Sequence, residues 1–246
     1  MSLSKAVASD LKSDLKNVIS VTGSMTAMIA VASVVAILAT AVGCGGSSSS
    51  GGPAGPPPIK NPKPRDKRSA VVVAGDSLAV GTGATAANWK IENCLRRELG
   101  LQAVVTLAAD GNSTRDTEAL FAGLAAAKPR VVVLSLGGND VLMAAAGESF
   151  PAQETFDNLR AFYRKLTDKG VLVIQLGLNP PAPEAARLAQ IADVAAAEGV
   201  MYVPDILHGL WKDSRYMTDA FHPNDAGYAK VCERVVEAMK PIYLKD

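Results

Sequence analysis

Five short apolar runs, none of which alternates with polar residues, constrain the fold of this 246-residue chain more than any other feature. The runs cover residues 70–74, 103–107, 131–136, 171–176 and 200–203. Unbroken apolar runs of this length are typical of strands that are buried on both faces. Helical stretches are expected between and after them, near residues 85–99, 114–127, 152–169, 184–198 and 225–240. This alternation predicts an α/β fold in which helices cover both faces of a five-stranded parallel sheet.

Polar and glycine residues follow the first four runs directly. These segments are Gly75-Asp76-Ser77-Leu78, Asp110-Gly111-Asn112-Ser113, Gly137-Gly138-Asn139-Asp140 and Asn179-Pro180-Pro181. Because ligands bind beyond the carboxyl ends of parallel strands, we expect the four segments to meet at one edge of the sheet. Asp219 and His222 lie just before the last expected helix and can reach the same edge.

A serine, a histidine and an aspartate at this edge indicate nucleophilic catalysis. The hydroxyl of Ser77 is a weak nucleophile and needs a base within hydrogen-bond reach. His222 suits that role, because a histidine accepts and returns protons near neutral pH. Asp219 stands three residues before it, so its carboxylate can accept from one ring nitrogen while the other nitrogen faces the serine. The sequence therefore predicts Ser77 as the nucleophile, with Asp219 and His222 as its relay.

Donors for a tetrahedral oxyanion are also present. Ser77 offers its own backbone N–H, and Gly111 offers a second, because glycine allows a close approach of the backbone to a substrate. The side-chain amide of Asn139 adds a third donor. We expect these three groups to form an oxyanion hole.

The same residues resemble the SGNH or GDSL hydrolase family. The matching blocks are GDSL at 75–78, Gly111 in AADGNST, Gly137-Gly138-Asn139-Asp140, and Asp219-Ala220-Phe221-His222-Pro223-Asn224. The resemblance extends from about residue 69 to the end of the chain, which implies one hydrolase domain over 69–246. It further implies a flavodoxin-like three-layer α/β/α sandwich and the hydrolysis of carboxylic esters or thioesters. The Ser-His-Asp triad would act through an acyl-enzyme, without a cofactor or metal.

Other interpretations exist for single residues. Ser77 taken alone could be a helix cap, an interpretation that the other three blocks oppose. Asp76 and Asp140 are interpreted as residues that order loops. His208 lies in LHGLW without a matching carboxylate pattern and is given a structural or peripheral role. The run GDSLAVGTGAT at 75–85 lacks the Gly-Lys-Ser/Thr ending of a phosphate-binding loop, so a nucleotide site is not expected.

Cysteine and histidine are scarce. None of the three cysteines lies in a CxxC pair, and only two histidines occur, so a structural zinc site is not expected. Cys94 and Cys232 fall on the first and the last expected helix. In an oxidising compartment they form either a disulfide or two separate buried thiols.

Residues 1–44 predict an export signal or a membrane anchor. Three lysines in the first 17 residues precede an uncharged run from Val18 to Val42. This run is long enough to cross the apolar core of a bilayer, which takes about 20 residues as a helix. An exported protein is therefore expected.

The end of the apolar run resembles a bacterial lipobox. Small residues precede Cys44, which would be lipidated and would become the new N-terminus. The expected product is a lipoprotein that is anchored in the membrane and faces the periplasm. An Asp directly after the lipidated cysteine often retains lipoproteins at the inner membrane. This position is Gly45 here, which favours the outer membrane. An uncleaved inner-membrane signal anchor and an ordinary cleaved signal remain alternatives.

Residues 45–68 predict a tether. GGSSSSGG is typical of a flexible linker, and PAGPPPIKNPKP favours extended polyproline II. The basic residues near its end are interpreted as a solvated linker, with contact to anionic head groups or cell-wall polymers as the alternative. The net charge of +1 argues against a nucleic-acid partner, which would require a basic surface. A monomer is expected.

Three functions are compatible with these residues. The first is an exported esterase, lysophospholipase or thioesterase that acts on a small acyl-ester or lysophospholipid-like substrate. The second is a carbohydrate O-deacetylase acting on cell-envelope polysaccharide, an interpretation that the tether favours. The third is a non-catalytic binding protein on the same fold, which an intact triad opposes.

Overall fold

The structure is a computed structural model that describes residues 66–181 and 185–244. The expected anchor over 1–44, its cysteine Cys44, and most of the tether over 45–68 lie outside the described residues. Among the helices that the structure describes, none is long and apolar enough to span a membrane.

Strands and helices alternate along the described chain. In order they are β1 (Val71–Gly75), α2 (Ser77–Val80), the 3₁₀ helix η1 (Ala87–Trp89), α3 (Ile91–Leu99), β2 (Val104–Ala108), the 3₁₀ helix η2 (Thr114–Asp116), α4 (Thr117–Ala127), β3 (Val131–Ser135), α5 (Gly138–Ala145), α6 (Ala152–Thr167), β4 (Leu172–Leu176), α7 (Ala185–Ala189), α8 (Ile191–Ala197), β5 (Met201–Val203) and α9 (Asp225–Tyr243). Each strand begins and ends within one residue of the expected apolar run.

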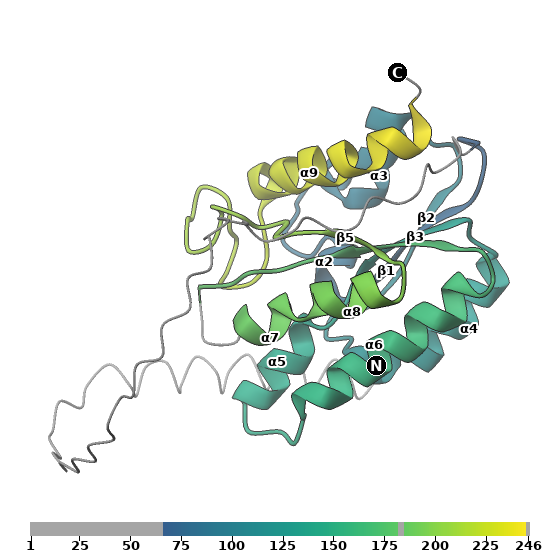
Figure 1. The fold of residues 1–246 in the computed structure, drawn as a ribbon. Helices are drawn as coiled ribbons and strands as arrows, with labels where there is room; N and C mark the ends of the chain where they lie inside the picture. The colour runs from purple at the N-terminus through teal and green to yellow at the C-terminus, as the bar shows by residue number, and fades with distance from the viewer. Residues whose placement is uncertain (1–65, 182–184, 245–246) are drawn as a thin grey trace, which may run out of the picture.

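The five strands form one parallel sheet in the order β2-β1-β3-β4-β5 (Figure 1). Helices α3 and α9 cover one face, and α4, α6 and α8 cover the other (Figure 1). The expected three-layer α/β/α fold is therefore confirmed, and its strand order is that of flavodoxin-like sheets. Strand β1 lies between β2 and β3, so the segment that follows it emerges between the ends of two neighbouring strands.

Alternate residues of β1 serve the two apolar cores. Val71 and Val73 pack with α3 and α9, while Val72 and Ala74 pack with α4 and α6. All four are fully buried. Successive side chains of a strand point to opposite faces, so a strand covered on both sides must be apolar throughout. This requirement explains the unbroken runs in the sequence.

The helices differ from the sequence prediction in several places, including the short α2 and the division of the helix expected over 184–198 into α7 and α8. The helix expected over 85–99 begins only at Ile91, after the short η1 helix. Thr85 and Ala86 instead donate their backbone N–H groups to the carboxylate of Asp225, at 2.8 and 3.4 Å. Helix α5, over Gly138–Ala145, lies where no helix was expected, and it buries Val141 in the core.

A disulfide between Cys94 and Cys232 joins α3 to α9. It resolves the choice between a disulfide and two thiols in favour of the disulfide.

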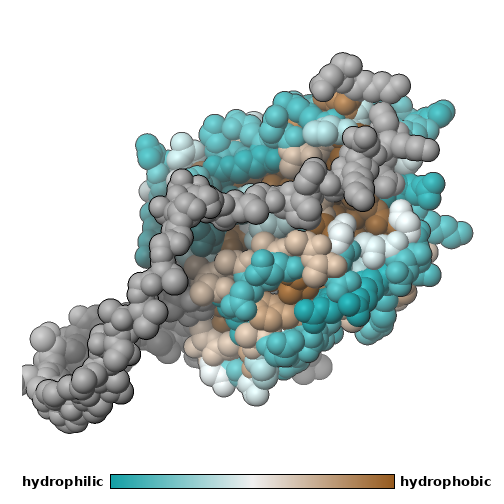
Figure 2. Space-filling view, in the orientation of Figure 1, coloured by the Kyte–Doolittle hydropathy of each residue, from teal (hydrophilic) through white to brown (hydrophobic). Residues whose placement is uncertain are grey.

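The face of the sheet opposite to α3 and α9 has a less polar surface over α7 and α8. Figure 2 shows apolar residues gathered there, in the alanine-rich stretch of the sequence, beside the more hydrophilic surface of α6.

Candidate active site

Ser77 stands on a sharp turn between β1 and α2. Gly75 ends the strand with φ of +127°, and a Cβ there would lie 1.8 Å from the carbonyl oxygen of Ser135, so only glycine fits. The next residue, Asp76, caps α2 by accepting from the backbone N–H of Leu78 at 3.0 Å. Ser77 is the first residue of α2, so its own N–H has no acceptor within the helix. The turn therefore presents both the hydroxyl and the N–H of Ser77 at the edge of the sheet.

The side chains of Ser77, His222 and Asp219 form a continuous hydrogen-bonded chain. The Oγ atom of Ser77 lies 2.9 Å from Nε2 of His222. The other ring nitrogen, Nδ1, lies 2.8 Å from Oδ2 and 3.0 Å from Oδ1 of Asp219. An ionised carboxylate accepts from Nδ1–H, which leaves Nε2 free to accept the serine proton. This geometry suits a serine activated by a histidine base.

The loop that carries the histidine is held at both ends. Thr218 N–H donates to the carbonyl oxygen of His222 at 2.8 Å, which closes a tight turn around Asp219. The side chain of Asn224 caps α9 by accepting from Gly227 N–H at 3.0 Å. Oδ1 of Asp219 also accepts from the N–H groups of Phe221 and His222, at 2.8 and 2.9 Å. The Asp-x-x-His spacing thus allows one carboxylate to order the turn and to orient the ring.

Burial and hydrogen bonding set the charge of Asp219. Partial desolvation raises its pKa, but the hydrogen bonds from His222 and from the N–H of Phe221 outweigh that effect, and the net pKa lies below the ordinary value. Asp219 is therefore ionised at neutral pH. Its side chain is 45% exposed, whereas that of His222 is 7% exposed, so the ring is shielded from water while its partner remains solvated.

The pKa of Asp76 shifts in the opposite direction to that of Asp219. Asp76 is buried next to Ser77, and desolvation raises its pKa to about 7, against the hydrogen bonds from Ser135 and from Leu78 N–H. Oγ of Ser135 donates to Oδ1 of Asp76 at 2.8 Å. Asp76 thus accepts hydrogen bonds from residues of helix α2 and strand β3, which agrees with its interpretation as a residue that orders the loop.

The three expected oxyanion donors come from three different elements. Gly111 adopts φ of +81° in the segment between β2 and η2. The side-chain amide of Asn139, on the first turn of α5, donates one of its two N–H bonds to the carbonyl oxygen of Asn112 at 2.7 Å. Asn112 in turn donates from Nδ2 to the carbonyl oxygen of Gly75 at 2.9 Å. These bonds tie the Gly111 segment to the Ser77 turn on one side and to α5 on the other.

Further contacts around the site were not anticipated from the sequence. The hydroxyl of Thr82 donates to Asp110 at 2.5 Å, and the hydroxyl of Thr85 donates to Asp225 at 2.5 Å. The phenol of Tyr228 donates to the carbonyl oxygen of Thr82 at 3.1 Å. Threonine and aspartate are common in loops, and no local spacing links partners that lie up to 146 residues apart.

The structure corrects the interpretation of His208. It was interpreted as lacking a carboxylate partner, but Asp205 stands three residues before it, and Oδ2 of Asp205 lies 3.3 Å from its Nδ1. The Asp-x-x-His spacing therefore occurs twice in the chain. The side chain of His208 is 83% exposed, and it lines a shallow hollow with Asn179 and Trp211 beyond β4 and β5.

Clustered metal ligands are not found in the described part of the chain: no group of three or more His, Cys, Asp or Glu side chains could hold an ion there.

Known proteins resemble this chain over most of its described length. A model of the GDSL-like Lipase/Acylhydrolase family matches residues 73–230. Esterase TesA of Pseudomonas aeruginosa is 30% identical over 184 residues, which cover 70% of this chain and 88% of that protein. A crystal structure of TesA has a TM-score of 0.62 at 28% identity and covers 70% of this chain and 99% of that chain.

Two more distant structures share the fold. The psychrotrophic esterase EstA from Pseudoalteromonas has a TM-score of 0.60 at 17% identity, over 70% of this chain and 97% of its own. A catalytic mutant of Axe2, an acetylxylan esterase from Geobacillus stearothermophilus, has a TM-score of 0.59 at 16% identity, over 72% and 97% of the two chains.

Proposed function

This chain belongs to the GDSL-like lipase/acylhydrolase family, and we propose that it cleaves carboxylic esters or thioesters with Ser77, His222 and Asp219 as its catalytic triad. Family membership makes it an esterase, and the resemblance expected from the four sequence blocks is confirmed.

In the proposed cycle, Oγ of Ser77 attacks the carbonyl carbon of the substrate while Nε2 of His222 takes the hydroxyl proton. The oxyanion of the tetrahedral intermediate accepts hydrogen bonds from the N–H groups of Ser77 and Gly111 and from the amide of Asn139. Collapse of the intermediate expels the alcohol or thiol, which leaves with the proton from His222. Water then attacks the acyl-enzyme with His222 as its base, and the carboxylic acid is released.

One observation carries this proposal: the 2.9 Å contact between Oγ of Ser77 and Nε2 of His222, continued to Asp219. A serine that only capped a helix would need no imidazole at its hydroxyl. The low pKa of Asp219 adds to the proposal, because an ionised carboxylate stabilises the imidazolium formed in the transition state.

The proposed substrates are small acyl esters, thioesters and lysophospholipid-like molecules. The test uses the full-length protein and a series of p-nitrophenyl esters from acetyl to palmitoyl, together with an acyl thioester and a lysophospholipid. We expect Ser77→Ala to lower kcat on the order of 10⁴- to 10⁶-fold. Ser214→Ala, a matched change at an exposed serine, should retain wild-type activity.

Covalent labelling gives a second readout. A fluorophosphonate probe should modify Ser77 in the wild type, and peptide mass spectrometry should locate the adduct there. Undiminished hydrolysis by Ser77→Ala would overturn the proposal, and an unlabelled Ser77 would favour a non-catalytic binding protein. Acetate release from acetylated glycans, with poor hydrolysis of longer esters, would instead select the O-deacetylase.

We further propose that the enzyme is exported and anchored through a lipid on Cys44, on the basis of the apolar run and the lipobox-like residues before it. Cells grown with a clickable palmitate analogue should label the wild type but not Cys44→Ser, and membrane fractionation should recover the labelled protein. A membrane-bound but unlabelled wild type would indicate an uncleaved anchor helix.

A further inference from the structure

The segment between β2 and η2 carries one oxyanion donor, Gly111, and contacts another. On the side of the nucleophile, its residue Asn112 is bonded to the carbonyl oxygen of Gly75. On the other side, Asn139 is bonded to the carbonyl oxygen of Asn112. Gly111 itself has a left-handed backbone, with no side chain to pack, so its position depends on the residues around it.

Directly after this segment, Thr114 begins η2 and is bonded to Asp140. The backbone N–H of Thr114 donates to Oδ1 of Asp140 at 2.8 Å, and its hydroxyl donates to Oδ2 at 2.6 Å. Both residues are fully buried. A carboxylate that accepts two such hydrogen bonds holds its partner in one orientation, because both the main chain and the side chain of Thr114 are engaged.

Asp140 also directly follows Asn139 on the first turn of α5. Consecutive residues of one helical turn therefore hold Asn112 and Thr114, on either side of residue 113. As a consequence, the amide of Asn139 and the N–H of Gly111 are fixed relative to each other through one rigid element.

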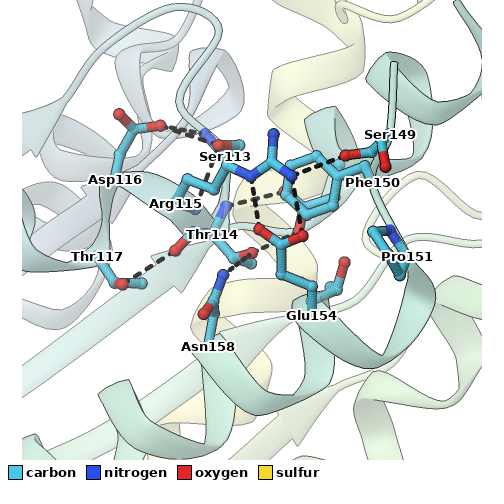
Figure 3. Close-up of polar contacts among 12 residues, drawn as sticks. Ser113, Thr114, Arg115, Asp116, Thr117, Ser149, Phe150, Pro151, Glu154 and Asn158 are labelled. Atoms are coloured by element: carbon cyan, nitrogen blue, oxygen red, sulfur yellow. Dashed lines mark hydrogen bonds and ion pairs between the residues drawn. The ribbon is translucent and has the colours of Figure 1, made fainter. Parts of the chain in front are cut away.

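A second layer of contacts fixes Thr114 from α6. Figure 3 shows Asn158 pointing at Thr114, and its Nδ2 lies 3.2 Å from the threonine hydroxyl oxygen. Beside it, the guanidinium of Arg115 faces the carboxylate of Glu154 at 2.6 and 2.9 Å and lies over the ring of Phe150, 4.0 Å from its centroid (Figure 3). This outer pair is partly exposed to solvent, whereas the Thr114–Asp140 pair is not.

Burial of a carboxylate is costly, and this cost calls for an explanation. Desolvation raises the pKa of Asp140 above its ordinary value, and the hydrogen bonds from Thr114 oppose the effect. An apolar residue at position 140 would avoid that cost but would leave the buried backbone N–H of Thr114 without its acceptor. The carboxylate of Asp140 therefore fixes Thr114, because it is the acceptor for both the main-chain and the side-chain donor of that residue.

We propose that Asp140, acting through Thr114, is a positioning residue that sets the distance between the oxyanion donors Gly111 and Asn139. This inference rests on the proposed function. Asp140 does not touch the reacting atoms; it holds the segment so that both donors meet one oxygen of the transition state. Because a displacement of about 1 Å can cost on the order of 100-fold in rate, loosening the segment should act on catalysis more than on substrate binding.

The test compares three variants of the full-length protein on one p-nitrophenyl ester. Thr114→Val removes the hydroxyl but keeps the volume and the backbone N–H, and should lower kcat about 10-fold. Asp140→Ala removes both acceptors and should lower kcat roughly 100-fold. Asp140→Asn keeps one acceptor oxygen and should lie between them. In all three, KM should stay within about twofold of the wild type, because the donors act in the transition state.

A control separates positioning from general loss of stability. Tyr163→Phe removes another fully buried hydrogen bond, the 2.8 Å contact between the Tyr163 hydroxyl and Gln175. It should lower the melting temperature to a similar extent but leave kcat unchanged. The acid limb of the pH–rate profile should also be the same in every variant, because Asp140 is not part of the proton relay.

Two results would overturn the inference. One is a set of Asp140 and Thr114 variants that lose stability while kcat stays within twofold of the wild type. The other is a loss confined to KM. Either outcome leaves the proposed function intact, because that function fails only if Ser77→Ala remains active or Ser77 resists the fluorophosphonate probe.

Discussion

Nε2 of His222 lies 2.9 Å from Oγ of Ser77, although the two residues are 145 positions apart in the chain. The contact brings the turn after β1 to the loop before α9. Thr218 contributes to it by donating from its hydroxyl to the carbonyl oxygen of Gly83, just beyond α2. Catalysis in the proposed enzyme therefore depends on the docking of two loops that are remote in sequence.

The carboxylate of Asp219 should matter for rate more than for stability. Asp219→Asn removes the charge that stabilises the imidazolium and disturbs the ring orientation, so we expect kcat to fall roughly 100- to 10,000-fold. The partial exposure of Asp219 places the expected loss of stability within about 1 kcal/mol. The measurements are kcat on a p-nitrophenyl ester and the free energy of unfolding in urea.

A matched control exists for this substitution. Asp213→Asn breaks the ion pair of Asp213 with Arg215 in the same region of the chain and should leave kcat unchanged. The pKa of Asp219 is held below the ordinary value, so Asp219 should remain ionised across the weakly acidic range. An Asp219→Asn variant with full activity would exclude Asp219 from the relay.

Asp76 should make the stability of the protein depend on pH. Its pKa rises from the ordinary 3.8 to about 7 in the folded chain, because burial disfavours the carboxylate. Between these values the folded chain binds more protons than the unfolded chain, so the free energy of unfolding falls as pH rises through this window. Asp76→Asn keeps an acceptor oxygen for Leu78 and Ser135 but cannot ionise.

Asp76→Asn should therefore gain stability relative to the wild type as pH rises from about 4 to 7, with no further gain above that range. The upper bound of this gain is about 4 kcal/mol, since one pKa unit corresponds to about 1.4 kcal/mol. Urea unfolding at three pH values measures the difference between the two proteins. Parallel stability curves for the two proteins would show that Asp76 does not titrate in this range.

Gly83 should be intolerant of any side chain. Its φ is +99°, and a Cβ would lie 2.3 Å from the carbonyl oxygen of Pro223 and 3.2 Å from Cβ of His222. Gly83→Ala should push the histidine loop away from the nucleophile and lower kcat about 100-fold. Steady-state kinetics and thermal unfolding measure the two effects.

Gly147 provides the comparison for Gly83. It also has a positive φ, of +90°, but a Cβ there would meet nothing within 4 Å. Gly147→Ala should cost about 1 kcal/mol of stability through backbone strain alone and leave kcat unchanged. If both variants lowered kcat equally, the close approach of Gly83 to the histidine loop would not be the cause.

The disulfide between Cys94 and Cys232 should stabilise the chain without taking part in catalysis. It closes a loop with a sequence separation of 138 residues, for which the chain-entropy model gives about 5 kcal/mol. Replacement of both cysteines by alanine should lower the melting temperature, and reductant should have the same effect on the wild type. The kcat of the folded double variant at 25 °C should match that of the wild type. An unchanged melting temperature in reductant would contradict this prediction.

The strands were predictable because their signal is local. A strand buried on both faces must be apolar at every position, and the five runs placed each strand to within one residue. The alternation of these strands with helices then defined the fold class. The residue types required for acyl transfer were also recognisable, since Ser77, Gly111 and Asn139 lie just after strands and Asp219 and His222 lie just before the last helix.

Other features were decided by contacts between remote segments. The start of α3 was placed too early because the N–H groups of Thr85 and Ala86 bind Asp225, about 140 residues downstream. Helix α5 was not predicted because the burial of Val141 and the bonds of Asp140 to Thr114 do not show in its own composition. The pairing of His208 with Asp205 was local but was overlooked.

The sequence by itself determined the layers of the fold, the order of its strands along the chain and the kinds of side chain at one edge of the sheet. Only the tertiary structure decided that Ser77 meets His222, that Cys94 bonds Cys232 and that Asp140 holds Thr114. The physical reason is that periodicity and residue type report on the immediate surroundings of a segment. Which distant segments touch depends instead on how the whole chain buries its apolar surface and satisfies its polar groups at once.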